Sequence, residues 1–214
     1  MQSFPDQTQA CEDRNFVEWH RGCLWCAVWV LRVDVPGVDA WVAQARDRLA
    51  PWLLPRYERQ PHITLAYRGL MPAEFVQAQQ HADVRALQQA QLSPFAVRIQ
   101  GTGSFSTVPY LGVDASTMLL QAHAALVATA PYPDWQYVPH VTLGHYGCQV
   151  PMEMVLPALQ AASAAIHAPV DVAVDALWLA RYRTDDIAGP LSYEGRFDLQ
   201  TQTYQANSEA LISV

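Results

Sequence analysis

One short pattern occurs twice in the chain and carries the side chains best suited to chemistry. It consists of proline, histidine, an aliphatic residue, threonine and leucine, with histidines at His62 and His140 and threonines at Thr64 and Thr142. Successive side chains of a β-strand point to opposite faces. Each copy therefore presents its histidine and threonine on one face, while its aliphatic residues anchor the other face in a core. These aliphatic residues are Ile63, Leu65, Val141 and Leu143.

Two histidines on a shared polar surface predict proton transfer. Because imidazole titrates near ~6.5, one ring can act as a base while the other, when protonated, acts as an acid. A neighbouring threonine hydroxyl supplies a neutral donor for a phosphoryl oxygen. This set indicates metal-free phosphoryl transfer, and two nearly identical motifs leave the acid and the base unassigned. The alternative is a polar strand face that meets solvent, but duplication of the whole pattern favours function.

Four further residues are candidates for substrate contacts. Arg68 and Tyr146 each lie six residues after a motif histidine, so a strand that continues that far points them to the histidine side. Arg181 and Arg183 flank a tyrosine near the end of a predicted strand, where a pair of guanidinium groups can hold a phosphate. Solvated surface charge is an equally good interpretation of that arginine pair.

Predicted strands and helices alternate along the chain in two successive stretches of similar order, which we call rounds. These elements position the candidate residues. The first round comprises strands at 24–33, 61–67 and 95–99 and helices at 38–49 and from Pro72 to about 87. The second comprises strands at 108–113 and 137–145, helices at 118–126 and 151–166, a strand at 170–179 and a last strand at 191–199. In the strand at 170–179 the alternation slips by one residue, which indicates a bulge. The pattern predicts an α+β fold of two lobes, each presenting a sheet.

Composition restricts the class of protein and of partner. The chain has 214 residues, of which 51% are hydrophobic and 15% charged, as expected of an ordinary folded protein. All 13 basic residues are arginines, and 20 acidic residues give a net charge of −7. This balance argues against binding of long duplex nucleic acid, whose affinity depends on neutralising many phosphates. The charge balance is compatible with a small anionic substrate or a nucleic-acid end.

The cysteines and the apolar segments point to no metal site and no membrane span. Cys23 and Cys26 are three residues apart on a predicted strand, so they point to opposite faces and are poorly placed to share a metal ion. With Cys11 and Cys148, they are expected to be reduced thiols. No apolar run approaches the ~20 residues that span a bilayer, and Met1–Arg14 lacks the order of a signal peptide. We expect a cytoplasmic protein.

The tandem HITL and HVTL segments resemble the paired H-x-T-x motifs of the 2H phosphoesterase superfamily, especially its bacterial 2′-5′ RNA ligase-like or cyclic phosphodiesterase branch. The resemblance implies a bilobal, pseudo-twofold α+β fold in which two antiparallel sheets line a central cleft and helices lie outside. It also implies hydrolysis of nucleoside 2′,3′-cyclic phosphates, typically at RNA ends, to 2′-phosphates without metal or other cofactor. Some members join RNA through a 2′-5′ linkage. Tyr193 is similar to a tyrosine near the end of many relatives and is a candidate substrate contact.

The resemblance also sets the expected organisation and partners. We expect a polar N-terminal extension at 1–14, one bilobal domain at 15–200 and a C-terminal tail at 201–214. The expected partner is a nucleotide or RNA end with a cyclic phosphate, bound by a monomer. The acidic balance differs from proteins that bind RNA ends, so free cyclic nucleotides, cyclic oligonucleotides and an ADP-ribose cyclic phosphate stay open. The alternatives are 2′-5′ ligation at the same site and a non-catalytic binding module, which intact histidines disfavour because arginine would serve phosphate binding.

The other histidines have no second catalysis-capable residue at a spacing that would place both on one face. The polar segment Glu18–Gly22 is interpreted as surface packing, with His20 held in reserve as a catalytic candidate. His145 follows His140 by five residues, so strand alternation sends it to the opposite face. Three histidines on predicted helices are interpreted as ordinary surface residues. These are His81, His123 and His167.

Overall fold

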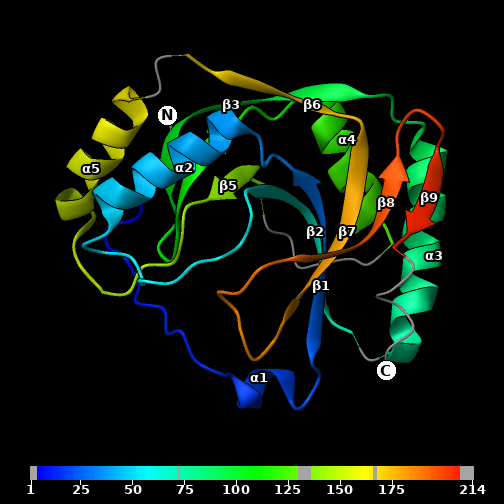
Figure 1. The fold of residues 1–214 in the computed structure, drawn as a ribbon, viewed down its shortest axis with the longest axis horizontal. Coiled ribbons are helices and arrows are strands. Elements are labelled where there is room, and N and C mark those ends of the chain that lie inside the picture. Colours follow the sequence, from blue (N-terminus) through cyan, green and yellow to red (C-terminus); the bar gives the residue numbers. More distant parts are fainter. Residues whose placement is uncertain (1–3, 72, 130–135, 166–167, 208–214) are drawn as a thin grey trace.

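The computed structural model describes residues 4–71, 73–129, 136–165 and 168–207 (Figure 1). The strands are β1 (Trp25–Arg32), β2 (His62–Leu70), β3 (Phe95–Ser104), β4 (Pro109–Val113), β5 (His140–Thr142), β6 (Val170–Val174), β7 (Ala176–Arg183), β8 (Ser192–Asp198) and β9 (Thr203–Ala206). The helices are α1 (Val17–His20), α2 (Pro36–Leu49), α3 (Ala73–Ala90), α4 (Thr117–Val127) and α5 (Met152–Ala164). The fold class is therefore α+β, as predicted.

The strands of the described ranges form one antiparallel sheet in the order β6-β3-β4-β5-β2-β1-β7-β8-β9. The two sheets implied by the resemblance are thus joined edge to edge, and the only residue pair between β5 and β2 in the described chain is Val141 with Ile63. Strands β4 and β5 on one side of this junction correspond to β1 and β2 on the other. The repeated motif therefore lies at the centre of the sheet, where its two copies are adjacent.

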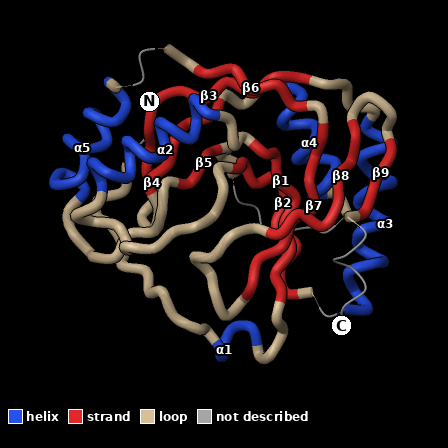
Figure 2. Tube along the Cα trace, in the orientation of Figure 1, coloured by secondary structure: helices blue, strands red, loops and turns tan. Residues whose placement is uncertain are grey.

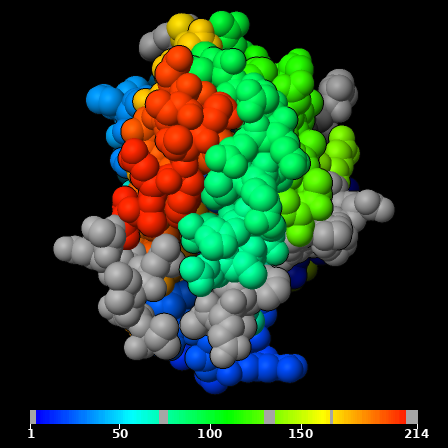
Figure 3. Space-filling view, turned by 90° about the vertical axis from the view of Figure 1, so that its right-hand side faces the viewer, coloured from blue at the N-terminus to red at the C-terminus, as the bar shows by residue number. Residues whose placement is uncertain are grey.

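The helices pack in two pairs, α2 with α5 and α3 with α4 (Figures 1 and 2). Each pair takes one helix from each round of the sequence, so the two rounds are interleaved in space. Figure 3 shows α3 on the surface between α4 and the C-terminal strands β8 and β9. None of the helices in the described ranges is both long and apolar enough to cross a membrane.

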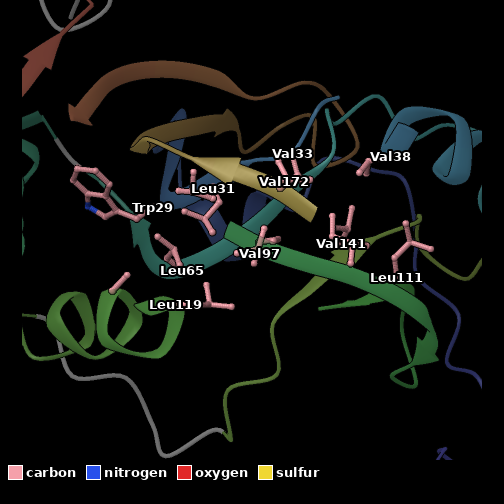
Figure 4. Packing of buried hydrophobic residues seen from close by; sticks show 14 of the residues in the cluster. Trp29, Leu31, Val33, Val38, Leu65, Val97, Leu111, Leu119, Val141 and Val172 are labelled. Atoms are coloured by element: carbon pink, nitrogen blue, oxygen red, sulfur yellow. The ribbon is translucent and has the colours of Figure 1, made fainter. Parts of the chain in front are cut away.

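The main core lies between the helices and one face of the sheet, which we call the helix face. Figure 4 shows Trp29, Leu65, Val97 and Val141 from four strands packed with Leu119 of α4. The opposite face, called the histidine face, carries a second apolar cluster on the strands β1 and β7 and on the residue before β8. This cluster includes Cys26, Val28, Val30, Ala180, Tyr182 and Leu191. Strand β1 is apolar along nearly its whole length because both of its faces are covered.

Local sequence explains where several elements begin. Pro36 starts α2 at a position where its missing N–H costs no helical hydrogen bond. Ser116 caps α4, since its side chain accepts a hydrogen bond from the backbone N–H of Leu119. The predicted start of α3 at Pro72 and the predicted end of α5 at residue 166 lie outside the described residues.

The structure corrects three sequence predictions of the fold. Residues 170–179 are not one bulged strand: β6 and β7 lie in different halves of the sheet, and the chain crosses between them at Asp175. The strand predicted at 137–145 is only three residues long. The predicted tail from residue 201 contains β9, which pairs with β8. The N-terminal extension is also attached, because the Thr8 hydroxyl donates to the Cys148 carbonyl at 2.8 Å.

Candidate functional site

The two motif copies meet at the junction of β2 and β5. Because Ile63 pairs with Val141 in antiparallel register, His62 lies opposite Thr142, and Thr64 lies opposite His140. All four polar side chains share the histidine face. The structure thus brings together the four residues that the sequence singled out, in an alternating arrangement around a local twofold.

The aliphatic members of the motifs anchor this arrangement from the helix face. Ile63, Val141 and Leu143 are fully buried and Leu65 is 1% exposed. All four belong to the main core, so the predicted alternation is confirmed for both motifs. Burial of one face fixes the strand register, because a slip of one residue would exchange the faces.

Both motif histidines are held in the same tautomer. The Nδ1–H of His62 donates to the carbonyl oxygen of Gln60 at 2.7 Å, and the Nδ1–H of His140 donates to that of Val138 at 2.7 Å. A carbonyl oxygen only accepts, so the ring nitrogen on this side must carry hydrogen. In each neutral ring Nε2 is therefore the basic atom, which is the atom available for proton transfer.

Burial favours the neutral form of both rings. Burial, together with the positive charges of Arg59 and of a protonated His140, lowers the pKa of His62 to about 4, while the hydrogen bond to Gln60 opposes this shift. Burial also lowers the pKa of His140, and the hydrogen bond to Val138 opposes it. A buried imidazole resists protonation because the charged form loses its hydration.

The surroundings of the two histidines differ. The ring of His140 lies between two aromatic rings, with centroids 5.1 Å from that of Phe105 and 5.2 Å from that of Tyr110. His62 instead has the guanidinium group of Arg59 close enough to influence its pKa. One half of the site is therefore aromatic and the other is cationic.

Sequence reasoning missed Arg59 and its neighbour Tyr57, which lie in the loop before β2. Tyr57 forms a side-chain hydrogen bond with Thr142. The guanidinium carbon of Arg59 lies 3.8 Å from the ring centroid of Tyr182, and its Nη2 donates to the Ile187 carbonyl at 2.5 Å. No strand or helix period marks this loop, so the only available signal was that Arg59 lies three residues before a motif histidine.

Arg59 and Arg46 differ from most arginines of the chain in their pairing. Eight arginines form ion pairs with carboxylates in the described chain: Arg14, Arg32, Arg56, Arg68, Arg98, Arg181, Arg183 and Arg196. Within the described ranges five arginines have no such partner: Arg21, Arg46, Arg48, Arg59 and Arg85. Of these, only Arg46 and Arg59 are partly buried. Arg46 lies over the ring of Tyr57 at 5.5 Å and donates to the Leu143 carbonyl. The two partly buried arginines without a carboxylate partner in the described chain thus lie near the motif residues.

Arg68 lies on the helix face, so its predicted orientation is wrong. Relative to β1, strand β2 contains two extra residues, Leu65 and Arg68, and such bulges interrupt the alternation of side chains. The side chain of Arg68 is 1% exposed, and its Nε and Nη2 donate to the carboxylate of Asp83 at 2.8 and 3.0 Å. Arg68 supports the packing of α3 on the sheet and does not reach the histidine face.

Tyr146 is also misplaced by the sequence prediction. Strand β5 ends at Thr142, and Gly144 has a φ angle of +149°, which L side chains rarely adopt. Beyond this change of direction Tyr146 is fully buried in the main core, and its hydroxyl is 2.7 Å from Ser104 Oγ. It therefore has no contact with the histidine face.

Arg181 and Arg183 do not form the predicted phosphate fork. Their strand β7 pairs regularly with β1, which places Tyr182 on the histidine face and the two arginines on the other. Arg181 forms an ion pair with Glu194 at 2.8 Å, and Arg183 forms one with Asp185 at 2.6 Å. Structural ion pairing is the better interpretation of both residues.

Tyr193 lies on the histidine face, as a substrate contact would require. It pairs with Ala180 of β7, and its ring packs against Trp178 with centroids 5.6 Å apart. Burial and the negative charge of Asp34 raise the pKa of Tyr193 to about 12, so the hydroxyl keeps its proton. The guanidinium carbon of Arg32 lies 4.6 Å from the centre of this ring.

Two other histidines have structural contacts. His123 is not an ordinary surface residue: its Nδ1 donates to the Leu65 carbonyl at 2.7 Å, and its ring stacks on Tyr137 at 3.8 Å. The Tyr137 hydroxyl donates to the Thr64 carbonyl at 2.9 Å. The stacked pair thus binds the two carbonyl groups at the first bulge of β2.

The remaining candidates make local structural contacts. His20 packs locally but is buried, so it is not the surface residue that the sequence predicted; its Nε2 lies 2.6 Å from the side-chain oxygen of Asn15. His145 packs against Tyr57 with ring centroids 5.3 Å apart. His167 lies outside the described residues. The four cysteines are free thiols, and no group of three or more potential metal ligands from His, Cys, Asp and Glu occurs in the described ranges.

The family model of the 2′-5′ RNA ligase superfamily matches residues 34–186. A search of curated proteins finds no match. TT0787 of Thermus thermophilus is similar in structure, with a TM-score of 0.56 and 18% identity over 82% of this chain and 98% of that chain. Escherichia coli LigT complexed with 3′-AMP gives a TM-score of 0.51 and 18% identity over 82% and 98% of the two chains. At these identities the structural likeness shows the fold.

Proposed function

Because the chain belongs to the 2′-5′ RNA ligase superfamily, we propose that it is a phosphoesterase that hydrolyses a nucleoside 2′,3′-cyclic phosphate to a 2′-phosphate. The single observation that carries this proposal is the pairing of the two motifs across one sheet junction. Each histidine lies opposite the threonine of the other motif and has its basic Nε2 available. Such a pair can serve both ends of one displacement at phosphorus.

The asymmetric surroundings support an assignment of roles. His62 lies beside the positive charge of Arg59, which disfavours its protonation, so we assign it as the general base. Its Nε2 takes a proton from water as the water oxygen attacks phosphorus. His140, when protonated, gives a proton to the ribose O3′ as the bond from that oxygen to phosphorus breaks. Water supplies the new oxygen on phosphorus, and the product retains the phosphate on O2′.

The threonines and Arg59 would stabilise the phosphoryl group. Thr64 and Thr142 have hydroxyl groups on the same face as the histidines, where they can donate to phosphoryl oxygens. Tyr57 holds Thr142 through its hydrogen bond. Arg59 and Arg46 provide positive charge that no described carboxylate neutralises. Charge that develops on the phosphoryl oxygens is thus met by groups that are already in place.

The substrate is a nucleotide or an RNA end with a cyclic phosphate. The LigT structure with 3′-AMP is consistent with a nucleotide ligand for this fold. With a net charge of −7, the protein is unsuited to long duplexes, and we propose a metal-independent cytoplasmic monomer. Within the superfamily, 2′-5′ ligation is the same displacement with a 5′-hydroxyl group in place of water, and the geometry of the motifs serves either nucleophile.

A non-catalytic nucleotide-binding module is the alternative from another class. It would bind phosphate through fixed positive charge and would need no histidine. Two rings held in one tautomer with Nε2 on the functional face favour proton transfer over this alternative.

The test is turnover of a panel of cyclic phosphates, with the products identified by phosphorus NMR. The panel contains an RNA with a 2′,3′-cyclic end, free cyclic nucleotides, a cyclic oligonucleotide and an ADP-ribose cyclic phosphate. His62→Ala and His140→Ala should each lower kcat at least ~10²-fold, because each removes one proton-transfer role. His81→Ala, on an exposed part of α3, is the control. Near-normal turnover by either motif variant would overturn the two-histidine mechanism.

A second arm of the test concerns metal. Activity should persist in EDTA, since the proposed chemistry uses protons and hydrogen bonds from side chains. Loss of activity in EDTA and its return with a divalent ion would replace the proposal with a metal-dependent mechanism.

A further inference from the structure

The histidine face continues beyond the motif residues to a group of one arginine and two aromatic side chains. On β1, Arg32 pairs directly with His62, so the two side chains share a face. Val30 pairs with Thr64 on one side and with Trp178 of β7 on the other, which places Trp178 on this face as well. Tyr193 of β8 completes the group, which we call the Arg32 shelf.

The members of the Arg32 shelf are in direct contact. The guanidinium carbon of Arg32 lies 4.6 Å from the ring centroid of Tyr193 and 5.0 Å from that of Trp178. The two rings meet edge to face, with an interplanar angle of 65°. All three side chains are only partly buried, so they present a preformed surface of flat groups.

The charge of Arg32 is already compensated. Its Nε and Nη2 donate to the two carboxylate oxygens of Asp34 at 3.2 and 2.6 Å. A guanidinium group held in this way offers its flat face and little net charge. Arg32 is therefore poorly suited to hold a phosphate, whereas Arg59 lacks such a partner in the described chain.

The spacing between the Arg32 shelf and the motif residues suits one nucleotide. Neighbouring strands lie about 4.8 Å apart, so Arg32 is one strand and Trp178 two strands from β2, or roughly 5 to 10 Å. A ribose bridges a distance of this order between its phosphate and its base. Nucleobases stack on aromatic rings and on arginine planes.

We propose that Arg32, Trp178 and Tyr193 form a stacking subsite for the nucleobase of the substrate. This inference rests on the proposed function, because it assumes that the phosphate lies between His62 and His140. It makes the substrate class nucleosidic: the protein should distinguish a nucleotide from a sugar phosphate without a base. Stacking accepts every base, so the preference should be broad across the four bases.

The experiment measures binding by calorimetry and does not depend on turnover. The ligands are nucleoside 2′-monophosphates and ribose 2-phosphate, which carry the same phosphate with and without a base. The parent protein should bind the nucleotides roughly 5- to 150-fold more tightly, the range expected for stacking of one base. Trp178→Ala and Arg32→Gln should remove most of this preference and leave the affinity for ribose 2-phosphate unchanged, while Trp178→Phe should retain most of it.

Arg98→Gln is the matched control, because Arg98 is also a strand arginine in a two-point ion pair, with Asp171, but lies on β3 and is exposed. It should keep the full preference. Equal affinity of the parent for both ligands, or parallel loss of both ligands in the variants, would overturn the subsite. A preference that depends on Arg32 and Trp178 in a protein without turnover would support the subsite and contradict the hydrolase. Turnover without such a preference would support the hydrolase and contradict the subsite.

Discussion

His62 and His140 occupy equivalent positions in a duplicated motif, yet the two halves of the site differ in charge and in the length of the strand that carries the histidine. His62 lies on the nine-residue strand β2, which pairs on both sides, and it has Arg59 beside it. His140 starts the three-residue strand β5 and lies against the rings of Phe105 and Tyr110. The motif provides the same two functional groups twice. Residues outside the motif make them unequal, and this is what a proton donor and a proton acceptor at one phosphate require.

The first prediction is a strong dependence of activity on pH. The base must be neutral and the acid protonated, and the pKa of His62 is about 4 while that of His140 is below its usual value. The value of kcat/KM should therefore rise through about pH 4, reach its maximum below about pH 6.5 and then fall tenfold per unit. By about pH 9 it should be more than ~100-fold below its maximum. Steady-state kinetics across this range tests it, and a maximum near pH 8 would contradict the proposed protonation states.

The second prediction concerns the threonines, which should contribute equally in both halves. Thr64→Ala and Thr142→Ala each remove a hydrogen bond to a charged phosphoryl group, worth about 1.5–3 kcal/mol, or roughly 10- to 150-fold in kcat/KM. Thr→Ser at either position should have a much smaller effect because the hydroxyl remains. The exposed Thr203→Ala provides the control. Full activity in both alanine variants would show that the hydroxyl groups do not hold the substrate.

The third prediction separates the two histidines through Arg59. Arg59→Gln removes a positive charge that lowers the pKa of His62, so the acidic limb of the kcat/KM profile should move to higher pH. The alkaline limb, assigned to His140, should stay in place. Arg183→Gln, which alters an exposed arginine on the other face, should move neither limb. Movement of the alkaline limb alone would exchange the acid and base assignments.

The fourth and smallest prediction uses the hydrogen bond between Tyr57 and Thr142. Tyr57→Phe should lower kcat/KM about 2- to 12-fold, the effect of one neutral hydrogen bond of about 0.5–1.5 kcal/mol. In a Thr142→Ala background the same change should have little further effect, whereas with Thr64→Ala the two effects should add. A double-mutant cycle measures both combinations. Additivity in both would show that Tyr57 does not act through Thr142.

The sequence predicted the centre of the site well because that part depends on local alternation. A period of two over five residues was enough to place His62 and Thr64 on one face and Ile63 and Leu65 on the other. Beyond that length the same alternation gave the wrong orientation for side chains. Bulges in β2 turned Arg68 to the helix face, and the early end of β5 placed Tyr146 in the core.

Other parts of the site depend on contacts between distant segments. Arg59 lies in a loop without periodicity, and its position near His62 follows from its contacts with Ile187 and Tyr182. The crossing from β6 to β7 resembled a bulge because one residue, Asp175, separates the two strands. Whether such a segment forms one bulged strand or two separate strands depends on which distant strands it pairs with. A local sequence pattern does not contain this information.

The single pair of Ile63 with Val141 has a further consequence for how the protein loses activity. It is the only residue pair that joins the two halves of the sheet between β2 and β5 in the described chain, and it separates the two motif histidines. Separation of the halves at this seam would break the sheet and move one histidine away from the other in the same event. Inactivation by mild denaturant should therefore coincide with the first loss of β-structure, as measured by circular dichroism.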